Sequence, residues 1–246
     1  MTDYHVHVGW YSNGYHSPCE IWSAVQDAGI DDIVVSSTST CAELYKLVVK
    51  EIRELLRLGG SRIHPLLWLT PRMFHTNCRW ALPYFLHSGI KWQGVKLHWR
   101  AHREWYYNRR LLHNALEVAR WLEVPVLMHT GEFEECHANV FKEVCLSYND
   151  LIFVLAHGRP LDETIDVLSS CSNTWVDTAF MPATEVKQLV ELGFCNRILF
   201  GTDAPINQLF YKNINTTDYL RSCISEMQKV LSKEQFETIA NNKLYR

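Results

Sequence analysis

The chain opens with Thr2-Asp3-Tyr4-His5-Val6-His7, a short β-type run that ends in two histidines spaced two residues apart. Side chains at positions i and i+2 of a strand lie on the same face, so both imidazoles lie on one side of this predicted strand. They can converge on a metal ion if the strand ends at a cavity. An isolated pair of this kind is also common in surface turns, so the rest of the chain has to decide between the two interpretations.

Runs of this kind recur eight times, alternating with helical patterns. The predicted strands cover residues 2–7, 32–36, 63–69, 94–99, 124–129, 152–157, 174–178 and 197–202. Most are nearly continuous apolar runs, which is typical of parallel strands covered on both faces. Eight β-then-α units in 246 residues predict a (β/α)₈ TIM barrel, a single domain over residues 1–246 with an extra C-terminal helix. The alternative, an open doubly wound sheet, usually carries a glycine-rich phosphate loop after an early strand, and this sequence has no such motif.

Several helices have recognisable ends. Ser17-Pro18-Cys19-Glu20 and Ser232-Lys233-Glu234-Gln235 both have the pattern of a capping box, and Gly29 closes the first of these helices. A third helix is predicted over residues 105–122. Its apolar stripe at helical spacing consists of Leu111, Leu112, Ala115, Leu116, Ala119 and Trp121.

Composition excludes several classes of protein. A net charge of -3 gives no reason to expect nucleic acid as a partner. The sequence has no apolar run long enough for a membrane span and no signal-peptide pattern, so we expect a cytoplasmic protein without a membrane partner. The sequence leaves open whether the protein is a homo-oligomer. Its eight cysteines form no C-x-x-C pair, which favours free thiols over disulfides or a thiolate zinc site.

Polar residues end most of the apolar runs. These strand-end residues are His5, His7, Lys96, His98, His129, His157 and Asp203. In a (β/α)₈ barrel the C-terminal strand ends meet at one rim, where active sites lie. Each histidine alone is more often a structural residue, but several imidazoles and a carboxylate at one rim have little purpose unless a cation binds there. Their joint placement predicts a metal site.

Five motifs at successive strand ends carry a family resemblance. They are Asp3-Tyr4-His5-Val6-His7, Gly94-Val95-Lys96-Leu97-His98, Pro125-Val126-Leu127-Met128-His129-Thr130-Gly131, Ala156-His157-Gly158 and Leu199-Phe200-Gly201-Thr202-Asp203-Ala204-Pro205. In this order the chain resembles the amidohydrolase superfamily, most closely the amidohydrolase-2 branch of metal-dependent hydrolases, lactonases and nonoxidative decarboxylases. The ending at residues 239–245 is similar to the closing helix of that family.

The resemblance implies a divalent metal held by His5, His7, His129 and Asp203, with water or substrate completing the sphere. Nitrogen and oxygen ligands suit zinc best, with manganese or another first-row metal as a substitute. His157 would orient the water or polarise the substrate. In hydrolysis Asp203 would take the proton of the attacking water and pass it to the leaving group, and in decarboxylation Asp203 or His157 would handle the proton that replaces CO₂.

Two residues have more than one predicted role. Some superfamily members carry a carboxylated lysine at this strand that bridges two metals, so Lys96 could be a metal bridge, a structural residue or a cation for a substrate carboxylate, and we favour the last. Glu132 could reach the metal, but a charge at a helix N-terminus is the favoured interpretation.

Further basic residues follow the same strand ends. Arg72, His98, Arg100 and Arg159 would join Lys96 in binding a small anionic organic substrate, unless they are solvated or paired locally. The predicted activity is metal-dependent hydrolysis of an ester, lactone or amide bond in such a molecule.

Three other functions are weighed against hydrolysis. A nonoxidative decarboxylase of an unsaturated or aromatic carboxylic acid is the first, although decarboxylases of this branch are commonly longer chains. A nuclease of a neighbouring branch is the second, and Lys96 argues against it because that branch usually has glutamate there. A noncatalytic metal- or ligand-binding barrel is the third.

Overall fold

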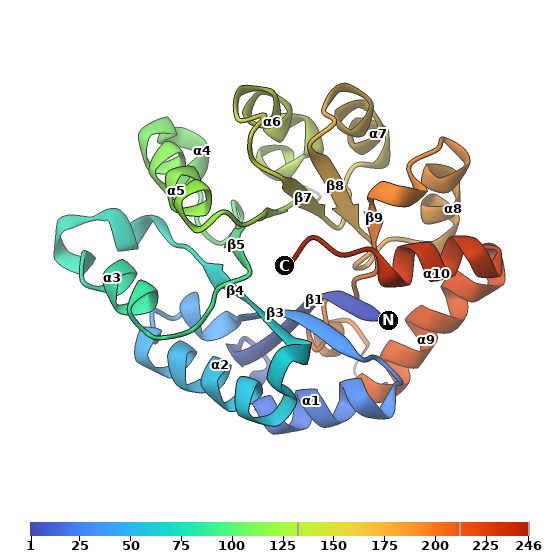
Figure 1. Ribbon diagram of the computed structural model, residues 1–246, viewed down its shortest axis with the longest axis horizontal. Coiled ribbons are helices and arrows are strands. Elements are labelled where there is room, and N and C mark those ends of the chain that lie inside the picture. The colour runs from blue at the N-terminus through green and yellow to red at the C-terminus, as the bar shows by residue number, and fades with distance from the viewer. Residues whose placement is uncertain (132, 212, 246) are drawn as a thin grey trace.

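The computed structural model is a ring of strands with helices on its outside (Figure 1), and it describes residues 1–131, 133–211 and 213–245. Glu132 lies outside the described residues. The strands are β1 (Thr2–Tyr11), β2 (Gly14–His16), β3 (Asp32–Ser37), β4 (Ile63–Trp68), β5 (Gly94–Leu97), β6 (Val126–His129), β7 (Phe153–Ala156), β8 (Thr174–Asp177) and β9 (Ile198–Leu199). They are ordered β2-β1-β3-β4-β5-β6-β7-β8-β9, with β2 antiparallel to β1 and the remaining neighbours parallel.

The ring closes between its last and first parallel strands. Val6 forms a parallel bridge to Ala204, and the Tyr4 amide donates to the Phe200 carbonyl at 2.7 Å. The amide of His7 donates to the carbonyl of Ala204 at the same distance. The structure is therefore a (β/α)₈ TIM barrel, as the sequence predicts, and its C-terminal strand ends form one rim.

A helical segment follows every parallel strand. The helices are α1 (Pro18–Asp27), α2 (Tyr45–Gly59), α3 (Ala81–Leu86), α4 (Glu104–Tyr107), α5 (Arg109–Leu122), α6 (Lys142–Ser147), α7 (Leu161–Ser170), α8 (Ala183–Glu191), α9 (Thr216–Val230) and α10 (Lys233–Asn241). Helix α10 is the predicted extra helix. Both predicted capping boxes are present, at Ser17 with Glu20 and at Ser232 with Gln235.

The helix predicted over residues 105–122 is wrong in two respects. It is interrupted at Asn108, whose side chain caps α5 by accepting from the Leu111 amide at 3.2 Å. Asparagine competes with helix continuation by bonding the backbone in this way. The predicted apolar stripe includes Trp121, but this side chain is 70% exposed, because Leu112, Leu116 and their neighbours already fill the face against the barrel.

The first strand differs most from its prediction. It runs on to Tyr11 and returns as β2, with Tyr11 paired to Gly14, so that Ser12 and Asn13 form a two-residue hairpin turn. The pairing register with β3 shifts between Asp3 and Val6. Such a bulge re-aims side chains.

The consequence of the bulge is visible in the packing. Tyr4 belongs to the cluster that fills the middle of the barrel, whereas Val6 and Val8 pack into the larger cluster with the helices. Strict alternation would place Tyr4 and Val6 on one face. The bulge lets Tyr4 fill the interior while His5 and His7 face the interior above it.

The C-terminal residues cross the opposite end of the barrel, where the tail reaches the centre of the ring (Figure 1). The rings of Tyr245 and His64 stack with centroids 3.4 Å apart, and the Leu244 amide donates to Tyr4 Oη at 2.6 Å. The tail therefore closes the N-terminal end of the barrel, away from the rim.

Other sequence expectations concern the whole chain. Within residues 1–131, 133–211 and 213–245, no helix has the length and apolar character needed to cross a membrane. All eight cysteines are free thiols, and Cys78, Cys136, Cys145 and Cys171 are buried.

Candidate metal centre

The rim holds three of the strand-end residues in direct contact. Asp203 Oδ1 lies 3.3 Å from His5 Nε2 and 2.9 Å from His7 Nε2. Burial raises the pKa of the Asp203 carboxyl, but the neighbouring histidines outweigh this and hold its pKa below the ordinary value. Asp203 therefore stays an anion among nitrogen ligands, as a metal ligand must.

His157 joins this group from β7. Its Nε2 lies 4.0 Å from Asp203 Oδ2, and ligand atoms of His5, His157 and Asp203 all lie within 4.8 Å of one another. Both His157 and Asp203 have positive φ angles, 72° and 62°. Non-glycine residues in this region are uncommon and concentrate at functional sites.

Three of the histidines have their Nδ1 atoms fixed by acceptors. The acceptors are Asp177 Oδ2, 2.9 Å from His5; the Ser36 carbonyl, 3.2 Å from His7; and the Ala179 carbonyl, 3.0 Å from His157. A carbonyl or carboxylate accepts only, so Nδ1 of His5 and of His157 carries the proton and Nε2 of each keeps its lone pair. Burial also lowers the pKa values of His5 and His7, which favours their neutral form. A convergent set of neutral Nε2 atoms beside a carboxylate, each histidine oriented through its other nitrogen, fits a divalent metal.

The ammonium of Lys96 lies between the two histidines of β1. Its Nζ is 2.8 Å from His5 Nε2, 3.0 Å from His7 Nε2 and 4.7 Å from the centre of the Trp68 ring. Burial lowers the pKa of Lys96 to about 8, against the opposing charge of Asp203. The Lys96 side chain is 2% exposed. The lysine predicted to bind a substrate carboxylate is therefore buried between the proposed metal ligands.

His129 and His98 lie beside this group. His129 Nδ1 is 3.1 Å from His157 Nε2, and its ring stacks on His98 with centroids 3.7 Å apart. His98 stacks in turn on Trp68 at 5.4 Å. The three rings form one aromatic wall, and burial lowers the pKa values of both histidines.

The predicted substrate arginines have different surroundings. Arg72 is exposed and pairs with Glu43 at 2.7 Å. Arg100 is exposed and lies over the Phe133 ring, 4.5 Å from its centre. Arg159 donates to the Phe180 carbonyl at 2.6 Å. These three contacts are with residues of the loops that follow the strands.

Sequence reasoning missed two residues of this region. Asp177 ends β8, is fully buried, and binds His5 and the amide of His157. Testing the predicted strand 174–178 for a polar end could have found it. The second is Tyr11, in the extension of β1, whose pKa is raised by burial and, in the same direction, by the charge of Asp203.

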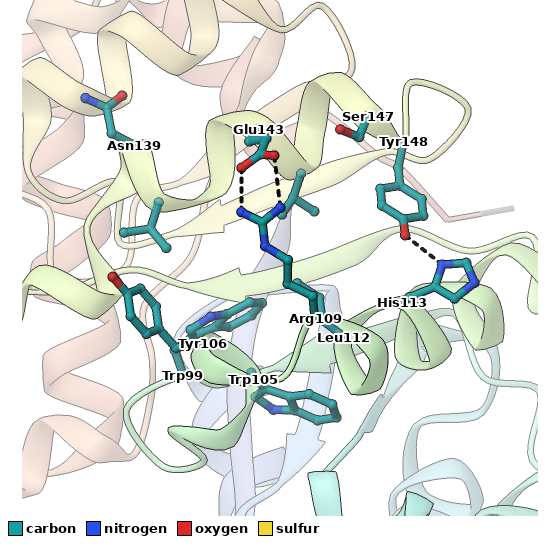
Figure 2. A pocket seen from close by; sticks show the side chains of 12 residues that line it. Trp99, Trp105, Tyr106, Arg109, Leu112, His113, Asn139, Glu143, Ser147 and Tyr148 are labelled. Carbon is teal, nitrogen blue, oxygen red and sulfur yellow. Dashed lines mark hydrogen bonds and ion pairs between the residues drawn. The ribbon is translucent and has the colours of Figure 1, made fainter.

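A separate hollow of about 650 Å³ lies outside the ring of strands, between α4 and α5 on one side and α6 on the other (Figure 2). Two contacts span it, from Arg109 to Glu143 at 3.0 Å and from His113 Nδ1 to Tyr148 Oη at 2.7 Å. Its lining, among the described residues, contains none of the predicted site residues. We therefore assign the hollow to the packing of neighbouring helices.

The barrel and its rim have the organisation of a metal-dependent amidohydrolase. The family model described as amidohydrolase matches residues 89–224, more than half of the chain, and the chain belongs to this family. A search of curated proteins found no match.

Solved structures share the whole barrel at low sequence identity. A probable 2-pyrone-4,6-dicarboxylic acid hydrolase from Acinetobacter baumannii, with citric acid bound, is 14% identical with a TM-score of 0.68, covering 97% of this chain and 95% of that one. The 5-carboxyvanillate decarboxylase from Sphingomonas paucimobilis is 9% identical with a TM-score of 0.67, covering 98% and 96%. The 5-carboxyvanillate decarboxylase from Novosphingobium aromaticivorans, complexed with manganese and a nitrobenzoic acid, is 12% identical with a TM-score of 0.61, covering 90% and 77%. At these identities the likeness establishes the fold.

Proposed function

We propose that this protein is a metal-dependent hydrolase that cleaves an ester, lactone or amide bond of a small anionic molecule. The observation that carries the proposal is the convergence of the Nε2 atoms of His5, His7 and His157 on the Asp203 carboxylate. His129 is the further ligand that the sequence predicts. Zinc is the metal we propose, because nitrogen and carboxylate ligands suit it, and manganese is the natural substitute.

A divalent metal bound here would supply a water of lowered pKa and would polarise the substrate carbonyl. The chain's own residues then move the proton. Asp203 Oδ1 lies beside the Nε2 atoms of His5 and His7, where it would join them as a metal ligand, and Oδ2 would accept the proton of the attacking water and return it to the leaving group. His157, fixed through the Ala179 carbonyl, would orient the water or the substrate beside Asp203.

Substrate binding is proposed for the basic side chains of the strand-end loops. Lys96, His98, Arg72, Arg100 and Arg159 would attract a carboxylate or phosphate group. The bound citric acid and nitrobenzoic acid of two structural neighbours are small anions of the same kind.

We further propose a cytoplasmic location and no nucleic-acid partner, and self-association stays a prediction.

Nonoxidative decarboxylation is the second candidate. It is favoured by the continuous stack of Trp68, His98 and His129, which offers a flat surface to an unsaturated or aromatic acid. A noncatalytic barrel would bind metal without turnover. Release of CO₂, hydrolysis of a lactone or ester, and absence of both in a metal-loaded sample separate the three possibilities.

The metal site is tested by elemental analysis of the full chain loaded with Zn²⁺ and freed of excess metal. We expect the wild type to hold zinc and His5→Ala and Asp203→Asn to lose it, whereas His87→Ala, at an exposed histidine after α3, keeps it. Bound zinc should also raise the melting temperature of the wild type, and a chelator should reverse this. Zinc content that is equal in all four proteins, or absent from all, contradicts the proposed site.

A further inference from the structure

Lys96 lies where the proposed metal ligands converge. Its Nζ contacts the Nε2 atoms of both His5 and His7, at 2.8 and 3.0 Å. An ammonium group only donates, so both Nε2 atoms accept from Lys96 through their lone pairs. An ammonium group and a metal ion use the same lone pairs, so they cannot occupy them together.

The charge of Lys96 also serves the rest of the site. Asp203 is 7% exposed and Lys96 is 2% exposed, so both charges are removed from water. A buried carboxylate without a nearby cation is costly, and the ammonium reduces that cost for the ligand set. A divalent cation that binds here therefore has to displace the Lys96 ammonium, which already stabilises the buried Asp203 carboxylate.

We propose that Lys96 competes with the metal ion for two of its ligand atoms. The ammonium group donates to the Nε2 atoms of His5 and His7, and the metal ion needs the lone pairs of the same atoms. Metal binding displaces the ammonium from these atoms, and the displaced group becomes available to a substrate carboxylate. This inference rests on the proposed metal site and assigns Lys96 as a positioning residue that sets metal affinity.

The competitor role and the other predicted roles of Lys96 differ in the change of metal affinity that they predict when the lysine is removed. A carboxylated lysine would be a metal ligand, so removing it would weaken metal binding. A lysine that only contacts substrate would leave metal affinity unchanged. Removing a competing ammonium instead strengthens metal binding, because it removes both a repulsive charge and the step of displacement.

The experiment measures the dissociation constant for Zn²⁺ at one pH, by competition with a chromophoric chelator, on the metal-free full chain. Lys96→Met keeps an unbranched side chain without charge, and Lys50→Met, at an exposed lysine of α2, is the control. We expect Lys96→Met to bind zinc about tenfold more tightly than the wild type, equivalent to about 1.4 kcal/mol. Lys50→Met should bind like the wild type.

Thermal melting provides a readout that does not depend on the chelator. Metal-free Lys96→Met should melt below the metal-free wild type, because Asp203 loses its cation, and zinc should raise its melting temperature by more than it raises that of the wild type. If Lys96→Met does not fold, Lys96→Gln replaces it, with the same expected results.

Each outcome decides the proposal. Zinc binding by the wild type with equal or weaker binding by the Lys96 variant overturns the competitor role and leaves the metal site intact. No zinc binding by either protein overturns both. Tighter binding by the variant, including binding only by the variant, supports the inference.

Discussion

At the scale of single residues, Asp177 connects the proposed metal ligands to the barrel. Its Oδ2 accepts from His5 Nδ1 at 2.9 Å, and its Oδ1 accepts from the backbone amides of His157 and Ala179 at 3.0 Å each. Burial raises the pKa of Asp177 to about 6, with His157 acting in the opposite direction. This carboxylate fixes the tautomer of His5 that a metal needs.

The substitution Asp177→Asn tests that role. The new side chain keeps an oxygen for the two amides, but its NH₂ group faces His5 Nδ1 and favours the tautomer with the proton on Nε2. We expect zinc affinity to fall by roughly 10- to 100-fold. Chelator competition measures the change, with Asp150→Asn, at an exposed carboxylate paired with Arg120, as the control. Wild-type affinity in the Asp177 variant would show that the tautomer of His5 does not govern binding.

At the scale of elements, the end of β1 depends on Gly9. This glycine has φ +97°, and a Cβ atom there would meet Ser39 Oγ and lie 2.9 Å from Glu51 Oε2. Glu51 is buried and accepts hydrogen bonds from the Ser37 and Ser39 hydroxyls at 2.5 and 2.9 Å. A side chain at residue 9 would therefore disturb a buried polar network.

We expect Gly9→Ala to lower the free energy of unfolding by about 3 kcal/mol, from backbone strain together with the displaced network. Gly14→Ala in the same hairpin is the matched control, since Gly14 has φ +130° with open space around its Cβ position. Strain alone should cost it about 1 kcal/mol. Denaturant titration measures both. Equal losses would mean that the network contributes nothing to the difference.

The strands and helices also show which features of the fold and of the site could be predicted from the sequence. The polar ends of apolar runs predicted that His5, His7, His157 and Asp203 lie close together, as they do in the structure, because a parallel barrel brings those ends together whatever its loops do. The bulge at Asp3–Val6 and the break at Asn108 depend on pairing partners and local side-chain bonds that periodicity does not contain. The position of Lys96 among the histidines depends on side-chain conformation, so its place between His5 and His7 could not be predicted.

At the scale of the whole molecule, the tail makes stability sensitive to pH through His64. Burial against Tyr245 lowers the pKa of His64, with Asp32 acting in the opposite direction. In the unfolded chain a histidine takes up a proton as the pH falls through about 6.5, whereas His64 in the folded protein takes it up only at lower pH. The unfolded state then binds more protons, so this residue's contribution to stability is lost as the pH falls below about 6.5.

His64→Phe removes the titrating group and keeps a ring that can stack on Tyr245. We expect the melting temperature of the variant, measured relative to the wild type, to rise as the pH is lowered from about 7 to about 5. His87→Phe, at an exposed histidine, should show no such trend. A difference between His64→Phe and the wild type that stays constant with pH would exclude His64 as the cause.

The hydrogen bonds that close the barrel join the beginning of the chain to a segment near its end. Thr202 Oγ1 donates to Asp3 Oδ2 at 2.6 Å across 199 positions of sequence. During synthesis on the ribosome, His5 and His7 emerge long before Asp203. Closing so long a loop carries an entropy cost that only the contacts of the last strand repay. The ligands of the proposed site therefore stay apart in a nascent chain, which cannot capture a metal ion with this set until the barrel is nearly complete.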